Sequence, residues 1–199
     1  MANVSRVNGF RPTKYLNGTE WNGQANLYFI PSGNATATFI GDLVTMDGTS
    51  DPVASGGLAL GVPSCVQATV GGAVVGAIVG FLPIQTNLNT PQHRVASTGR
   101  YCWVVDDPMV VFEVQQSGAV TIGDVNANCN IVIGAGSTTT GQSGMQADSS
   151  TIAVTATLQL RIVAFSQRAD NDLTSTSAKY LVKINNHQLG SGTGVAGVL

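Results

Sequence analysis

The stretch YCWVVDDPMVVFEVQ, residues 101–115, decides the fold class of this chain. It consists of two short apolar runs, rich in β-branched and aromatic residues, on either side of Asp106, Asp107 and Pro108. Such runs are typical of β-strands, and aspartate followed by proline is typical of the turn between two strands. We therefore predict two strands joined by a hairpin corner at the aspartates.

Asp106 and Asp107 are also the first candidates for chemistry, because paired carboxylates can act as a general acid and a general base. Neighbouring residues of an extended strand point to opposite faces, so two adjacent acids there cannot share one substrate. A catalytic pair converges instead from different strands or loops. We therefore interpret the two aspartates as turn residues and not as a catalytic pair.

The β pattern continues through the chain. The segment 36–48 ends in Asp47-Gly48, which is a strong hairpin-turn signal. No segment combines the apolar period of a helix with helix caps. The sequence predicts an all-β sandwich or barrel of short antiparallel strands with an extended N-terminal arm. Further strand-like runs cover residues 67–83, 119–125, 130–136, 150–167 and 179–189.

Residues 1–35 form the predicted arm. Half of the twelve aromatic residues of the chain lie within its first 39 residues, among turn signals and without a regular period. Aromatic side chains commonly anchor protein interfaces. The alternative, which the residues leave open, is that this segment wraps around its own domain. The candidate interface residues are Phe10, Arg11, Tyr15, Trp21 and Tyr28.

Residues 36–189 form the predicted β domain. This domain can also be read as two similar β units, about 36–115 and 116–189. The reason is that two short strings recur in the same order. Ile-Gly-Asp at 40–42 precedes Ile-Val-Gly-Phe at 78–81, and Ile-Gly-Asp at 122–124 precedes Ile-Val-Ala-Phe at 162–165. Glycine permits a turn at such a place, and aspartate can hydrogen-bond the backbone there.

Two segments lack strand character. The segment GAGSTTTGQSGMQADSS, residues 134–150, is low in complexity and has no large apolar residue except Met145. We expect it to be a mobile loop or long hairpin tip that orders only on a partner. Residues 190–199 are glycine-rich and are predicted to be a flexible tail.

The chain is poor in charge. Charged residues make up 10% of it, against about 25% in a typical soluble domain. None occurs from Pro52 to His93 or from Val125 to Ala147. Interface cores are depleted in charge, so this favours a surface that faces other protein. The alternative is a β-protein with a neutral polar surface. The nine basic residues are scattered, which gives no footprint for nucleic acid or anionic membrane.

The residue patterns of enzymes and cofactor sites are missing. The sequence has no nucleophile elbow, phosphate-binding loop, dinucleotide-binding motif or calcium loop. His93 and His187 are the only histidines, and neither has a catalytic setting. Cys65, Cys102 and Cys129 are widely spaced and odd in number, which predicts reduced core thiols. We predict no enzymatic activity, no cofactor and no metal.

The sequence also bears on location. The N-terminus, MANVSRVNGFRP, has no apolar run of signal-peptide length. The most apolar segment, Val70–Leu82, has thirteen residues with four glycines, fewer than the roughly 20 needed to span a bilayer. We expect a chain made in the cytoplasm that has no membrane contact.

Several blocks carry a resemblance to a known family. NGFRPTKYLNG at 8–18, followed by NLYFIPSGNATATFIGDLVTMDG at 26–48, resembles the opening of the capsid cement proteins of tailed bacteriophages, also called head decoration proteins. RYCWVVDDPMVVFEVQ at 100–115 and LRIVAFSQRADNDLTSTSAKYLVKINNHQL at 160–189 look like later segments of the same family. The resemblance is a pattern of strand and turn blocks over roughly residues 1–189.

This resemblance implies a β-rich virion protein that binds the outside of an assembled head and reinforces it against the pressure of the packaged DNA. It implies the major capsid protein as partner, self-association as a homotrimer, and no catalytic residues. Two other functions stay open: another virion β-module, of a tail or fibre, and a carbohydrate-binding β-module. For the second, Trp21 and Trp103 are the only tryptophans, and Trp103 lies within an apolar strand.

Overall fold

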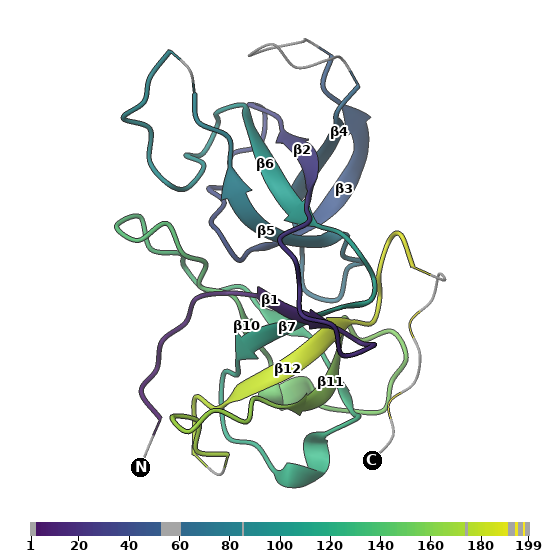
Figure 1. The fold of residues 1–199 in the computed structure, drawn as a ribbon. Coiled ribbons are helices and arrows are strands. Elements are labelled where there is room, and N and C mark those ends of the chain that lie inside the picture. Colours follow the sequence, from purple (N-terminus) through teal and green to yellow (C-terminus); the bar gives the residue numbers. More distant parts are fainter. Residues whose placement is uncertain are drawn as a thin grey trace.

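The computed structural model describes residues 3–52, 61–84, 86–173, 175–190, 194 and 197. Within these ranges the chain forms twelve β-strands and two short 3-10 helices. The predicted all-β class is therefore confirmed. The strands gather into a closed barrel and an open sheet, which lie one above the other in Figure 1. Seven of the ten residues of the predicted tail, 190–199, lie outside the described residues.

Five strands close the barrel, in the order β2-β4-β3-β5-β6. All neighbours in it are antiparallel except β2 and β4, which run parallel. Its interior is apolar, with Ile30, Val44 and Ile78 fully buried. The strands are β2 (Asn26–Ile30), β3 (Leu43–Ser50), β4 (Pro63–Gln67), β5 (Gly76–Phe81) and β6 (Arg100–Val105).

Five further strands form the open sheet, in the order β1-β7-β12-β11-β8, and all its neighbours are antiparallel. A two-stranded ribbon, β9 (Ile131–Val132) with β10 (Gln146–Ala147), lies beside it. The 3-10 helices are η1 (Ile122–Asp124) and η2 (Ser149–Thr151). The strands of the sheet are β1 (Arg11–Tyr15), β7 (Val110–Gln115), β8 (Asn128–Cys129), β11 (Leu160–Phe165) and β12 (Lys179–Ile184).

One apolar core joins the two units. Leu43, Val74 and Ala77 of the barrel side pack in the same buried cluster as Phe112 and Tyr180 of the sheet. A shared core of this kind resists separation, because opening it would expose apolar surface that contributes about 25 cal/mol per Å². The barrel and the sheet are thus two parts of one folded body.

The predicted hairpin corner at Asp106 and Asp107 is wrong. β6 pairs with β2 and β5 in the barrel, whereas β7 pairs with β1 and β12 in the sheet. The aspartates do form a bend, in which the backbone N–H of Val110 donates to the carbonyl of Asp107 at 3.1 Å. This bend carries the chain from one unit to the other, so the structural boundary lies there and not near residue 115.

The two units are not alike. One is a closed barrel and the other an open sheet. The two Ile-Gly-Asp strings also differ: Gly41 has a φ of +93°, whereas residues 122–124 are the 3-10 helix η1. Asp42 accepts a hydrogen bond from the backbone of Phe39, and Asp124 accepts one from the backbone of Thr121. The shared string therefore reflects the turn preference of aspartate and not a duplicated unit.

The segment 134–150 is packed against its own chain, contrary to the prediction that it orders only on a partner. Its tip is a hairpin turn, in which the N–H of Ser137 donates to the carbonyl of Gln142 at 2.9 Å. Its second arm bridges to the barrel side, where the N–H of Ser143 donates to the carbonyl of Ile40 at 2.8 Å. Met145 is fully buried in the shared core.

Candidate functional site

The structure places the five candidate interface residues in three different environments. Phe10 and Tyr28 are 1% and 3% exposed, and both belong to the core of the chain. Tyr15 and Trp21 are half-buried, and Arg11 is exposed. The aromatic segment therefore packs on its own domain, with β1 added to the sheet and β2 closing the barrel. Phe10 and Tyr28 are not available to a neighbouring protein.

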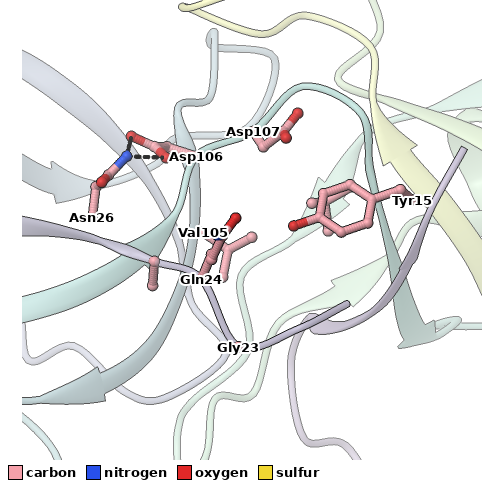
Figure 2. A pocket seen from close by; sticks show the side chains of 9 residues that line it. Tyr15, Gly23, Gln24, Asn26, Val105, Asp106 and Asp107 are labelled. Carbon is pink, nitrogen blue, oxygen red and sulfur yellow. Dashed lines mark hydrogen bonds between the residues drawn. The ribbon is translucent and has the colours of Figure 1, made fainter. Parts of the chain in front are cut away.

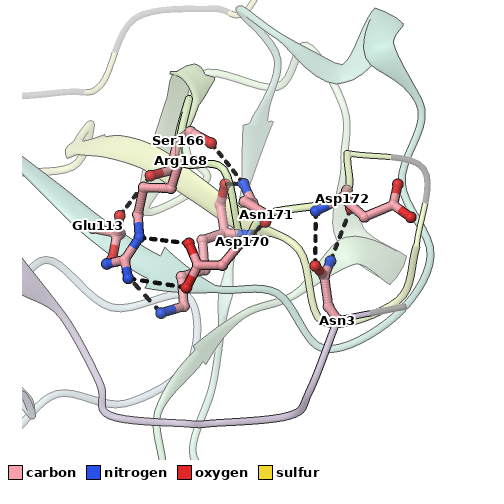
Figure 3. Close-up of polar contacts among 8 residues, drawn as sticks. Asn3, Glu113, Ser166, Arg168, Asp170, Asn171 and Asp172 are labelled. Carbon is pink, nitrogen blue, oxygen red and sulfur yellow. Dashed lines mark hydrogen bonds and ion pairs between the residues drawn. The ribbon is translucent and has the colours of Figure 1, made fainter. Parts of the chain in front are cut away.

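The first described residues run along the sheet and are fastened by polar side chains. The Asn3 side chain accepts the N–H of Asp172 and donates to its carbonyl, both at 2.8 Å. Gln115 accepts the N–H of Arg6 at 2.7 Å and donates to the hydroxyl of Ser5 at 3.1 Å. Figure 3 shows Asn3 beside the loop that carries Asp172.

An ion-pair cluster lies next to this contact (Figure 3). Glu113 of β7 is 3.4 Å from the guanidinium of Arg168 and 3.8 Å from the ammonium of Lys179. Arg168 also pairs with Asp170 at 2.9 Å, and this pair raises the pKa of Arg168 and lowers the pKa of Asp170. Both partners are solvent-exposed, so the pair adds little stability. The cluster orders the loop after β11, and its four charges are paired with one another.

A polar pocket of about 480 Å³ lies where the barrel meets the sheet, and we call it the junction pocket. It is bounded by β1, by the connection from β1 to β2, and by the bend after β6. Figure 2 shows its polar side chains around a common hollow. Its lining residues are Tyr15, Gly23, Gln24, Ala25, Asn26, Val105, Asp106, Asp107 and Val110.

Asp106 and Asp107 both line the junction pocket, which the sequence had not predicted. Their side chains do not follow the alternation of a strand, because the two residues lie in the bend after β6 and not in extended strand. Asn26 donates to the two oxygens of Asp106 at 2.9 and 3.1 Å, and the Tyr28 hydroxyl donates at 2.9 Å. Asp106 is thus held in place by neighbours of the barrel.

The junction pocket is equipped for hydrogen bonding. Burial, followed by the hydrogen bond to Asp106, raises the pKa of Tyr28 well above its ordinary value, so this phenol stays a donor at neutral pH. Asp107 accepts the N–H of Met109 at 2.7 Å, which fixes its carboxylate. No serine, cysteine, lysine or histidine stands among the lining residues. The arrangement can orient a polar ligand through hydrogen bonds.

A second hollow, of about 350 Å³, adjoins the first and is lined by Trp103 with Val79, Gly80, Gly23 and Ala25. We call it the Trp103 hollow. Trp103 is 41% exposed, although its strand is apolar. Its neighbours in β6 face inwards, since Cys102 and Val104 are fully buried. The alternation of side chains along a strand is the signal that could have placed Trp103 on the exterior.

The exterior of the barrel is almost free of charge. The segment 26–105 contains five charged residues, of which four are buried: Asp42 and Asp51 are 1% and 3% exposed, and Arg94 and Arg100 are 0% and 8% exposed. Asp47 is the one charged residue that is exposed in the described part of this segment. The other charged residues of the chain belong to the N-terminal segment, to the bend at Asp106 and Asp107, and to the sheet unit.

The buried arginines fasten the connection between β5 and β6, residues 82–99. Arg94 donates to the carbonyls of four residues, and Arg100 donates to those of three. In the described part of this connection, Ile84, Leu88 and Val95 are exposed, Leu88 at 80%. Figure 1 shows the connection extending beyond the barrel at the end away from the sheet. The two arginines are hydrogen-bonded within the chain, whereas apolar side chains of the connection are exposed to solvent.

The cysteines are buried free thiols, as the sequence predicts. Cys65 and Cys102 lie inside the barrel with their sulfur atoms 3.9 Å apart. Burial raises the pKa of Cys129 to about 12, so this thiol stays protonated at neutral pH. Within the described ranges, no group of three or more His, Cys, Asp or Glu side chains could hold a metal ion.

Both histidines are buried, and neither forms a catalytic pair with a nucleophile in the described part of the chain. His93 stacks on Phe39 with ring centroids 4.9 Å apart. His187 is 4% exposed, and its Nδ1 accepts the N–H of Leu189 at 3.0 Å. Burial lowers the pKa of both imidazoles, which favours their neutral forms.

Acidification is expected to destabilise the fold through His187. Burial lowers its pKa below the ordinary value of 6.5, so the unfolded chain takes up a proton more readily than the folded chain. The contribution of His187 to the free energy of unfolding is therefore fully present above pH 6.5, and it is lost as the pH falls below that value. We expect the free energy of unfolding, measured in urea, to fall less steeply on acidification in His187→Asn, whose amide oxygen takes the place of Nδ1 and can still accept the N–H of Leu189. Identical pH profiles for the two proteins would contradict this assignment.

Comparisons of the chain with protein family models, with curated proteins and with solved structures find no match. In the described part of the chain, no helix is long and apolar enough to cross a membrane.

Proposed function

We propose that this chain is a structural protein that binds the outer surface of a phage head as a self-associated unit and stabilises contacts between major capsid subunits. The observation that supports the proposal most is the exterior of the barrel, where Asp47 is the one exposed charge among the described residues of segment 26–105. Interface cores are depleted in charge in the same way.

The β5–β6 connection is the proposed contact with the head. Its apolar side chains, Ile84, Leu88 and Val95, are exposed on a segment that Arg94 and Arg100 hold internally. A surface that is ordered before binding loses less conformational entropy when it docks. Burial of uncharged surface also avoids the cost of removing charges from water.

Several weak contacts are sufficient for such a role. A standard interface buries about 800 Å² on each partner, and the apolar part contributes about 25 cal/mol per Å² before association costs. A trimer that engages several capsid subunits at once gains effective affinity without a stronger single contact. The function therefore requires a neutral surface repeated by symmetry, and it requires no reactive group.

A single charge on the β5–β6 connection is expected to weaken binding. Leu88→Glu would bury an unpaired carboxylate at the interface, which costs about 2–5 kcal/mol and lowers affinity at least thirtyfold. The stability of the free protein should change by less than about 0.5 kcal/mol, because Leu88 is 80% exposed. Co-sedimentation of the purified chain with heads assembled without it measures the affinity.

The matched control is Ile122→Glu, which places the same charge on the sheet unit at a residue that is 69% exposed. Retained binding by this variant, with loss in Leu88→Glu, supports the β5–β6 connection as the contact. Equal binding by both variants would reject that contact. Failure of the unmodified chain to sediment with heads, together with a monomeric mass by light scattering, would reject the proposed function itself.

A further inference from the structure

We propose that the junction pocket and the Trp103 hollow together form a binding groove for a neutral oligosaccharide. This function is separate from attachment of the barrel to a head. Gly23 and Ala25 line both hollows, so one ligand lying across this segment can contact both. Their volumes, about 480 and 350 Å³, lie in the range of small-molecule sites.

The Trp103 hollow supplies a flat apolar surface. Gly80 lies directly opposite Trp103 in the barrel, and a Cβ atom added to it would be 3.9 Å from the indole ring. The other lining residues, Gly23, Ala25 and Val79, are small. An exposed indole among small residues offers an aromatic face to the C–H groups of a sugar ring, which carry the partial positive charge that such a face attracts.

The junction pocket supplies the polar half of the groove. It contains two carboxylates, two amides and a phenol, from Asp106, Asp107, Gln24, Asn26 and Tyr15. Carboxylates accept hydrogen bonds from hydroxyl groups, and amides can both donate and accept, so adjacent sugar hydroxyls can be held in pairs. Both carboxylates are already fixed by hydrogen bonds from the chain, which limits the entropy lost on binding.

The charge of the groove selects the class of ligand. Neither hollow is lined by Lys, Arg or His, and the junction pocket carries Asp106 and Asp107. Acidic sugars and phosphate are disfavoured by these carboxylates. A cationic peptide would satisfy them, but the Trp103 hollow offers it a flat face and no deep apolar pocket for an anchoring side chain. A neutral sugar satisfies both halves of the groove.

The test is titration with neutral trisaccharides. Maltotriose, cellotriose and N-acetylchitotriose are added to the folded full chain up to about 10 mM, and binding is followed by calorimetry and by tryptophan fluorescence. We expect saturable binding of at least one of them. Trp103→Ala should weaken it about tenfold or more, and Asp107→Asn about threefold, since one oxygen acceptor is kept. Ile122→Ala, on an exposed residue of the sheet unit, should leave it unchanged.

Two outcomes would overturn the assignment. One is the absence of binding by all three sugars. The other is binding that Trp103→Ala does not weaken. If Trp103→Ala instead weakens sedimentation with heads while no sugar binds, the exposed indole is a protein contact, and the sugar groove is rejected while head binding stands. Gly80→Gln provides a second variant, since its side chain would fill the hollow without replacing a core residue.

Discussion

Replacement of Arg94 by leucine is expected to lower the free energy of unfolding by about 3–5 kcal/mol. Arg94 is fully buried, and its guanidinium donates to the carbonyls of Pro31, Asn34, Thr36 and Thr98 at distances of up to 2.9 Å. Leucine would leave four partly buried carbonyls without these donors, and a buried polar group that stays unsatisfied costs about 1–3 kcal/mol.

The chemistry of arginine explains why this side chain suits the position. Burial lowers the pKa of Arg94, but a guanidinium stays protonated in proteins and carries donors in a fixed planar fork. Lysine carries its charge on a single ammonium group and cannot reach all four carbonyls. Arg94→Lys should therefore lower the free energy of unfolding, but by less than Arg94→Leu does. The control is Arg11→Leu, at an exposed residue of β1, with an expected change below about 0.5 kcal/mol.

The free energies of unfolding of the three variants, measured in urea at neutral pH, test whether Arg94 stabilises the fold in this way. A loss below about 1 kcal/mol in Arg94→Leu would mean that the carbonyls find water or other donors, and that the β5–β6 connection is not held by this residue. Head binding of Arg94→Lys is informative as well. A folded variant with a loosened connection should bind more weakly if that connection is the contact.

Replacement of Gly9 by alanine is expected to cost about 3 kcal/mol. Gly9 has a φ of +68°, which disfavours any residue with a Cβ atom. An added Cβ would lie 2.4 Å from the carbonyl oxygen of Gly41 and 2.5 Å from the Cβ of Ser143. The N-terminal segment, the barrel side and the 134–150 hairpin meet at this point, and the contacting backbone cannot move aside without breaking their hydrogen bonds.

Gly18→Ala is the matched control. Gly18 has a φ of +90°, yet an added Cβ would meet no atom within 4 Å. Gly18→Ala should therefore lower the free energy of unfolding only by the cost of placing alanine at a positive φ, about 1 kcal/mol. The difference between the two variants in urea unfolding measures how tightly the N-terminal segment is packed. Equal losses would show that residues near Gly9 are not packed in solution, and would restore the hypothesis of a free arm.

Local composition was sufficient to predict the β class, the bend at Asp106 and Asp107, the free cysteines and the shortage of charge. These properties depend on residues close together in the chain. β-branched residues, aspartate and proline act through their own backbone preferences. The alternation of Cys102, Trp103 and Val104 could also have identified the exposed indole, since it too is local.

The pairing of the strands was decided by the tertiary structure alone. β6 and β7 are consecutive but belong to different sheets, whereas Asn3 bonds to Asp172, 169 residues away. The 134–150 hairpin is ordered by the barrel side and the shared core, and Arg94 is buried because four carbonyls surround it. Sequence periodicity shows which face of a strand is apolar, but not which distant segment covers it. The closed barrel, the uncharged exterior and the shared pocket of Asp106 and Asp107 all depend on that choice of partner.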